Sequence, residues 1–167
     1  MVTMALYKNI MLWRHADALP IGNNIPDDIS RPLSKKGRQQ AKTMAAWLKR
    51  YLPKDTIIIS SHALRSKQTA IALTNDFVLS DSIAPGASLE KVIESINSLS
   101  DGNKSESNLL IVGHQPWLGQ LAACLLNPIP DAKSLNIKKA AVWWFKRVEN
   151  QSANAFDLIT VQTPSLL

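Results

Sequence analysis

The feature of this sequence that most restricts its fold is the alternation of short apolar segments with segments of helical periodicity. Residues 6–13, 56–60 and 109–112 are short apolar runs, which predicts buried strands. After each run, apolar side chains recur at three- and four-residue spacing, which predicts amphipathic helices. This alternation is typical of a three-layer α/β/α sandwich with a mainly parallel central sheet. We expect residues 1–167 to form a single domain.

Helix boundaries can be predicted from capping residues and prolines. The predicted helices cover residues 34–53, 63–73, 89–99 and 116–126. Ser34 is a suitable N-cap, and Pro116 suits a first helical turn, where its missing N–H costs nothing. Residues 140–148 and 155–161 predict two strands joined by a polar turn, paired antiparallel at the edge of the sheet.

Residues 16–33 interrupt this pattern with three prolines and several Asn and Asp residues, which predicts a long loop. Loops of this length are usually functional. The loop directly follows the first predicted strand. It would therefore lie beside any site at the carboxyl end of that strand.

Composition narrows the class of protein. Hydrophobic residues make up 46% and charged residues 19% of the chain, which is typical of a globular domain. The net charge of +6 is spread in small groups and could attract anionic substrates. Nucleic-acid binding is not expected, because aromatic residues are not interleaved with the basic ones. The sequence also predicts neither a membrane span nor a signal peptide, and so a cytoplasmic location.

Three polar clusters follow the three predicted buried strands. They are Arg14 with His15, residues 60–65 with Arg65 at their end, and Gly113 with His114. In a parallel sheet, ligands bind beyond the carboxyl ends of the strands, so these clusters are expected to converge. Two arginines and two histidines can bind and transfer a phosphoryl group, which needs a nucleophile and several donors to its oxygens.

The residues predict a mechanism in which His15 is the nucleophile. Arg14, Arg65 and His114 would hold the phosphoryl oxygens, and water would then hydrolyse the phosphohistidine. The leaving group usually needs a proton, for which Asp17 and Glu90 are the candidates. Asp17 can equally be a loop-capping residue beside the substrate, and Glu90 a first-turn helix residue.

Other chemistries fit these residues less well. A zinc site built on His15, His62 and His114 is disfavoured, because Arg14 would repel a cation and no metal-ligand spacing occurs. A serine-based triad would need a G-x-S-x-G turn, which the sequence lacks. Cys124, the single cysteine, lies in an apolar run and is expected to be a buried structural thiol.

The sequence resembles the histidine phosphatase superfamily, also called the phosphoglycerate mutase-like family, and within it the small SixA-type phosphohistidine phosphatases. The resemblance is carried by motifs that occur in family order: LWRHADA (12–18), RPLSKKGRQQA (31–41), SSHALRSKQTA (60–70), PGAS (85–88) and VGHQPWLGQL (112–121). The sequence departs from the family pattern at three positions: Ala16, where the family usually has Gly, His62, where it usually has Pro, and Ser66, where it usually has Ala.

The resemblance implies a phosphoglycerate mutase-like fold and a phosphatase that needs no metal or cofactor. It implies that His15 is phosphorylated and that Arg14, Arg65 and His114 form the phosphate pocket. The expected substrate is phosphohistidine in a protein, presented to an open pocket. Two alternatives remain: a phosphatase of small phosphoesters such as sugar phosphates, and a non-catalytic module that binds phosphorylated partners.

Overall fold

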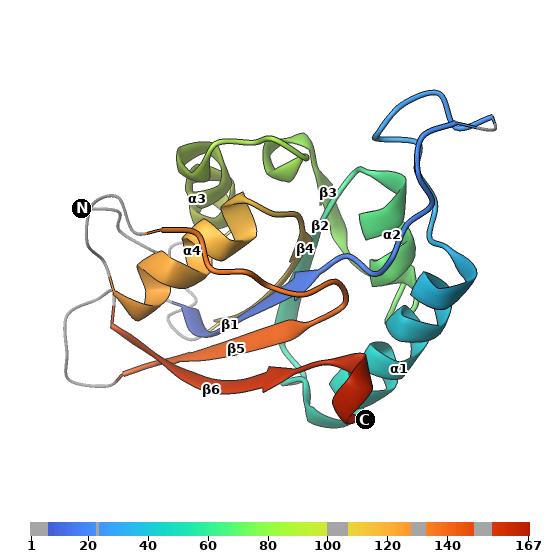
Figure 1. The fold of residues 1–167 in the computed structure, drawn as a ribbon. Helices are drawn as coiled ribbons and strands as arrows, with labels where there is room; N and C mark the ends of the chain where they lie inside the picture. Colours follow the sequence, from blue (N-terminus) through green and yellow to red (C-terminus); the bar gives the residue numbers. More distant parts are fainter. Residues whose placement is uncertain (1–6, 23, 100–106, 128–132, 149–154) are drawn as a thin grey trace.

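A six-stranded sheet forms the centre of the computed structural model, with helices on both faces (Figure 1). The structure describes residues 7–22, 24–99, 107–127, 133–148 and 155–167. The helices and strands, in chain order, are β1 (Tyr7–Arg14), α1 (Lys35–Tyr51), β2 (Thr56–Ser61), α2 (Leu64–Ile71), β3 (Val78–Ser80), α3 (Leu89–Ser98), β4 (Ser107–Gly113), α4 (Trp117–Leu126), β5 (Val142–Arg147) and β6 (Phe156–Gln162). Two short 3₁₀ turns, Asp81–Ile83 and Pro164–Leu166, complete it.

The strand order β3-β2-β4-β1-β5-β6 confirms the predicted, mainly parallel sheet. Strands β3, β2, β4 and β1 run parallel to one another, whereas β5 pairs antiparallel with both β1 and β6. Strand β3 was not predicted, because three residues are too few to show an alternating pattern. Since β4 lies between β2 and β1, the carboxyl ends of these three strands meet at one edge of the sheet.

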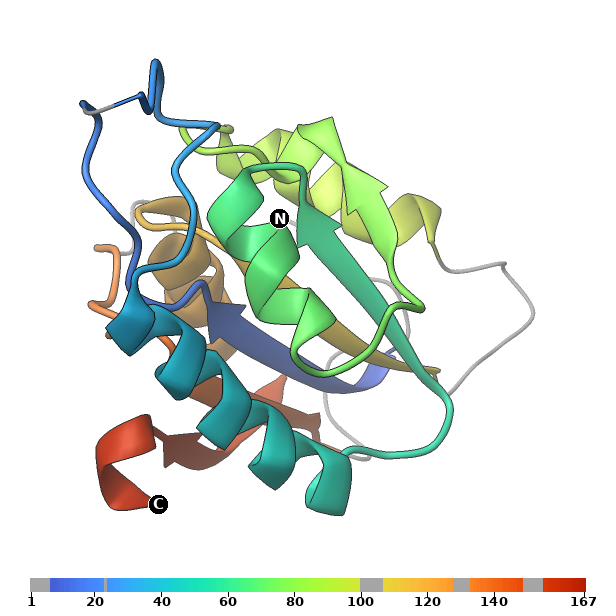
Figure 2. The same ribbon diagram turned by 90° about the vertical axis from the view of Figure 1, so that its right-hand side faces the viewer.

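Alternate side chains of the inner strands pack into two separate cores, one on each face of the sheet. Ile10 and Leu12 of β1 join the core beneath α3 and α4, whereas Met11 and Trp13 join the core beneath α1 and α2. A strand directs successive side chains to opposite faces, so a strand covered on both sides must be apolar throughout. Figure 2 shows α1 and α2 together on the near face of the sheet. The three-layer prediction is therefore confirmed.

The helix boundaries agree with their capping signals, with one correction. Ser34 is the N-cap of α1, and its Oγ accepts the N–H of Gly37 at 2.9 Å. Pro116 occupies the N-cap position of α4 and not its first turn, so the helix begins one residue later than predicted. A proline fits either place, because neither requires an intrahelical N–H. The predicted linker over 100–106 and turn over 149–154 lie outside the described residues.

Apart from residue 23, which is not described, residues 16–33 form the predicted loop, and its described residues contain two isolated β-bridges. One joins Ala18 to Leu33 and closes the base of the loop, and Leu64 N–H donates to Ile29 O at 2.9 Å. These contacts fold the loop back over the start of α2.

Among the described residues, no helix is long and apolar enough to cross a membrane. The cytoplasmic location stays a prediction.

Candidate active site

The carboxyl ends of β1 and β4 are joined directly at the predicted site. His15 N–H donates to Gly113 O at 3.1 Å, which places His15 beside the residue that precedes His114. A side chain at Gly113 would bring its Cβ to 2.1 Å from the Trp117 ring. Glycine therefore allows Trp117 to pack under the strand end, and Trp117 in turn lies with its ring 6.5 Å from that of His114.

The His15 ring is buried and held in one tautomer. Its Nδ1 lies 2.8 Å from Ala16 O, so Nδ1 carries the proton and donates it to this carbonyl. The lone pair is then on Nε2. Burial, opposed by the Ala16 carbonyl and reinforced by the charges of Arg65, Arg14 and Lys139, lowers the pKa of His15 to about 3. The ring is thus neutral near pH 7, and its Nε2 presents a lone pair.

Arg65, in the first turn of α2, is aimed at that nitrogen. Its Nε–H donates to His15 Nε2 at 3.3 Å, while Nη2 donates to Asp28 Oδ2 at 2.7 Å and Nη1 to Asp28 O. The side chain is 4% exposed and bonds from all three nitrogens. Asp28, from the loop, therefore fixes the guanidinium, and hydrogen bonds from Arg31 and Arg65 outweigh burial and lower the pKa of Asp28.

His114 lies next to His15, with ring centroids 5.0 Å apart and planes tilted by 49°. Its Nε2 is 3.2 Å from Ser66 Oγ, and its Nδ1 is buried without a hydrogen-bond partner. Burial first, and then the neighbouring His15 and Arg65, lower the pKa of His114 to about 2. Both imidazoles are therefore neutral at the same place in the fold.

Arg14 completes the group, which we call the histidine–arginine cluster: Arg14, His15, Arg65 and His114. Its Nη1 donates to Ile137 O at 2.7 Å, and its Nε is buried without a hydrogen-bond partner. Burial and the charge of Arg65 lower the pKa of Arg14. Two cations held close together in a partly buried site favour the binding of an anion. The structure thus brings together the four residues that the sequence singled out.

The two predicted proton donors are placed differently. Asp17 lies at the rim, where its Oδ1 accepts from Lys139 Nζ and its Oδ2 from Ser34 Oγ, both at 2.7 Å. These bonds lower the pKa of Asp17, so its carboxylate is ionised and a poor acid near pH 7. Glu90 is exposed in the first turn of α3. The role of either residue as an acid stays a prediction.

His62 does not join the cluster but turns toward the 3₁₀ segment after β3, with Nδ1 2.7 Å from Asp81 Oδ1. Within the described part of the chain, no three His, Cys, Asp or Glu side chains are grouped as a metal site.

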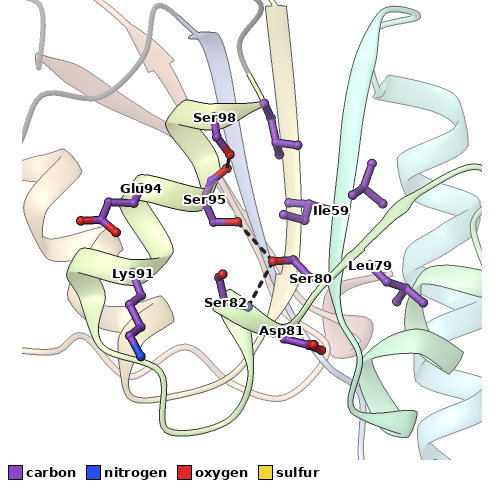
Figure 3. A pocket seen from close by; sticks show the side chains of 11 residues that line it. Ile59, Leu79, Ser80, Asp81, Ser82, Lys91, Glu94, Ser95 and Ser98 are labelled. Carbon is purple, nitrogen blue, oxygen red and sulfur yellow. Dashed lines mark hydrogen bonds between the residues drawn. The ribbon is translucent and has the colours of Figure 1, made fainter.

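Cys124 is half-buried, and so it is less enclosed than the sequence predicts. A separate pocket between β3 and α3 contains none of the four cluster residues (Figure 3).

Sequence reasoning missed the residues that orient the cluster. Asp28 gave only a loop signal, although an acidic residue in a loop beside a predicted arginine-rich site could have suggested an ion pair. Thr69 links two parts of the site, because its Oγ1 accepts Ala16 N–H at 3.1 Å and donates to Arg65 O at 2.7 Å. Lys139 comes from the far end of the chain, and no local pattern indicates its contact with Asp17.

Comparison with solved structures shows that the whole chain shares a known fold. The protein histidine phosphatase SixA complexed with tungstate matches with a TM-score of 0.74 and 21% identity, over 95% of this chain and 98% of that one. A candidate phosphohistidine phosphatase SixA from Agrobacterium tumefaciens gives 0.72 and 23%, over 94% and 98%. A phosphoserine phosphatase mutant from Entamoeba histolytica gives 0.67 and 16%, over 95% and 98%.

Comparison of the sequence with protein families identifies a narrower relationship. No curated protein matches the chain at a significant level. Residues 10–86, however, match the model of the histidine phosphatase superfamily, branch 1. This segment contains Arg14, His15 and Arg65, the first three members of the cluster, together with Asp28. Over these residues, which are slightly less than half of the chain, the sequence is similar to branch 1 of the histidine phosphatase superfamily.

Proposed function

We propose that this protein is a metal-independent phosphatase that forms a phosphohistidine on His15 and that its substrate is phosphohistidine in another protein. The observation that carries the proposal is the state of His15. Its Nδ1–H is held by Ala16 O, so its Nε2 carries the lone pair and lies 3.3 Å from the Arg65 Nε–H. A neutral, oriented imidazole beside a cationic donor is the arrangement that in-line attack on phosphorus requires.

The reaction takes place in two steps. The substrate imidazole first takes a proton from solvent on its second ring nitrogen. His15 Nε2 then forms a bond to phosphorus as the bond from phosphorus to the leaving nitrogen breaks, and neutral imidazole departs. Positive charge develops on the His15 ring, and the Nδ1–H bond to Ala16 O stabilises it. Water then attacks phosphorus as the bond from phosphorus to His15 Nε2 breaks. Inorganic phosphate and neutral His15 are released, and one proton returns to solvent. Arg14, Arg65 and His114 would hold the phosphoryl oxygens throughout.

The weakness of the nearby acid favours a phosphoramidate over a phosphoester. Asp17 is held ionised by Lys139 and Ser34, so it can supply little acid to an alkoxide. An imidazole leaving group needs less assistance, because it is far less basic than an alkoxide. Similarity to the structure of a protein histidine phosphatase supports the same substrate class.

The test is to trap the intermediate. The protein is incubated with a labelled phosphohistidine protein and quenched in alkali, where phosphohistidine survives. Label is expected on His15, and His15→Ala is expected to abolish both label and turnover, while His62→Ala keeps both. Label that persists in His15→Ala would place the nucleophile elsewhere.

A substrate panel separates the alternatives. Turnover of the phosphohistidine protein without added metal, and little turnover of sugar phosphates, is the expected result. The reverse preference would indicate a phosphatase of small phosphoesters. Binding of phosphorylated partners without any turnover would indicate a non-catalytic module.

A further inference from the structure

The Ser66 hydroxyl forms a hydrogen bond with the His114 ring, and the proposed mechanism gives it no role. Ser66 lies in the first turn of α2 and is completely buried. Its Oγ is 3.2 Å from His114 Nε2, across 48 residues of sequence. A buried hydroxyl that meets a buried imidazole must share one proton with it, and two arrangements are possible.

In the first arrangement Ser66 donates its hydroxyl proton to His114 Nε2. The hydroxyl is then satisfied, and the His114 proton resides on Nδ1. In the second arrangement His114 Nε2–H donates to Ser66 Oγ, which leaves the hydroxyl proton without an acceptor. Within the described residues, Ser66 Oγ has no hydrogen-bond contact other than His114. An unpaired buried donor costs about 1–3 kcal/mol, so the first arrangement is favoured.

The two arrangements also differ at the other nitrogen. His114 Nδ1 is buried and lacks a partner. In the first arrangement it is an N–H donor whose unmet bond a phosphoryl oxygen can accept. In the second it is a bare lone pair, which would repel that oxygen. The unsatisfied atom therefore suits an anionic ligand only if Ser66 is the donor.

We propose that Ser66 fixes the tautomer of His114 and thereby makes His114 Nδ1–H a hydrogen-bond donor to the phosphoryl group. Ser66 is a positioning residue, because it acts through His114. Both histidines then carry their proton on Nδ1, but with opposite consequences. The Nδ1–H of His15 donates to Ala16 O, which leaves the lone pair of the nucleophile on Nε2. The Nδ1–H of His114 has no such acceptor and can donate to the ligand. This last assignment rests on the proposed function, whereas the tautomer does not.

The tautomer can be read directly from ¹⁵N chemical shifts of the ring nitrogens in the free protein. The chain has only three histidines, and substitution of His15 and of His62 assigns the remaining signals to His114. We expect a protonated Nδ1 and an unprotonated Nε2 for His114 near neutral pH. Protonated Nε2 in the unmutated protein would overturn the proposal without any Ser66 variant.

Variants then test whether Ser66 is the cause. Ser66→Ala is expected to convert His114 to a mixture of tautomers, and Ser66→Thr, which keeps the hydroxyl, to restore protonated Nδ1. The matched control is Ser95→Ala, which removes a helical hydroxyl 3.2 Å from Ser80 Oγ in the pocket between β3 and α3 (Figure 3). It is expected to leave the His114 signals unchanged. An unchanged tautomer in Ser66→Ala would overturn the role of Ser66.

Inorganic phosphate serves as the probe for the donor role. Ser66→Ala is expected to weaken phosphate binding about 3- to 10-fold, the range for loss of one hydrogen bond. Full phosphate affinity in a Ser66→Ala protein whose tautomer has changed would overturn the donor role of Nδ1. Failure of the proposed function is distinguishable, because it would appear as absence of turnover in the unmutated protein while the tautomer stays as stated.

Discussion

The Arg65 side chain illustrates how much one residue of this site depends on the shape of its charged group. Three separate nitrogens of its guanidinium reach His15 and two atoms of Asp28. A lysine has a single nitrogen, which cannot make these contacts from one position. A positive charge alone is therefore not enough to make the contacts of Arg65.

We predict that Arg65→Lys lowers kcat/KM about 100-fold or more, because removal of one fixed donor to a transition-state oxygen costs about 10²–10³ in rate. Steady-state kinetics on a phosphohistidine protein measure the loss. Arg31→Lys is the matched control, since Arg31 also pairs with Asp28, at 2.9 Å, but has no contact with His15. Equal losses in the two variants would show that Asp28, and not the aim of Arg65, limits the reaction.

The two buried histidines make stability depend on pH. In the folded protein their pKa values are lowered to about 3 and about 2, whereas the unfolded chain titrates near 6.5. Below pH 6.5 these two imidazoles bind protons in the unfolded chain but stay unprotonated in the folded protein. Stability is therefore present above about pH 6.5 and is lost as the pH falls, by up to about 1.4 kcal/mol per pH unit for each group.

Urea unfolding at about pH 7 and about pH 5 measures this loss, in a window where few carboxylates titrate. We expect the free energy of unfolding to fall less steeply in His114→Gln than in the unmutated protein, because one buried imidazole is gone. His62→Gln, which alters a partly exposed ring, is expected to keep most of the original slope. Identical slopes in all three proteins would contradict neutral burial of His114.

At the scale of elements, helix α1 is tied to the site through its N-cap. Ser34 Oγ accepts Gly37 N–H at 2.9 Å and donates to Asp17 Oδ2 at 2.7 Å. A Cβ at Gly37 would lie 1.8 Å from Asp17 O, so the helix and the strand-end loop touch through backbone atoms. One residue thus satisfies the helix end and holds the loop that follows His15.

We predict that Ser34→Ala lowers the free energy of unfolding by about 1–2 kcal/mol, because both the cap and the bond to Asp17 are lost. Ser88→Ala, at the N-cap of α3, is the control. Its Oγ accepts Lys91 N–H at 3.4 Å, a weaker contact, so we expect a smaller loss. Denaturant unfolding compares them, and a larger effect at Ser88 would contradict the argument.

Helices and strands with a local sequence signal could be predicted, whereas the orientation of the side chains in the site could not. The N-cap at Ser34 and the apolar runs of β1 and β4 depend only on residues that are neighbours in sequence. The three-layer arrangement and the convergence of the strand ends could therefore be predicted. The bond from Arg65 to Asp28 joins residues 37 apart through a loop without periodicity. That from Ser66 to His114 spans 48 residues, and which nitrogen it meets depends on three-dimensional packing alone.

For the whole molecule, the net charge of +6 is unevenly placed, and α1 is its most cationic element. The helix carries six Lys and Arg residues and no acidic residue over Lys35–Tyr51, and these cations are exposed. It begins at Ser34, which contacts Asp17, two residues beyond His15. Positive potential that extends from the site in this way raises the rate of encounter with anionic substrates.

We predict that kcat/KM falls severalfold between about 20 mM and about 200 mM salt while kcat changes little, because salt screens the encounter and not the buried cluster. Lys35→Glu combined with Lys42→Glu, seven residues apart on one face of α1, should lose most of this salt dependence. Lys91→Glu combined with Lys146→Glu changes the net charge equally from exposed positions on α3 and β5. If both pairs respond alike, total charge and not the cationic face of α1 attracts the substrate.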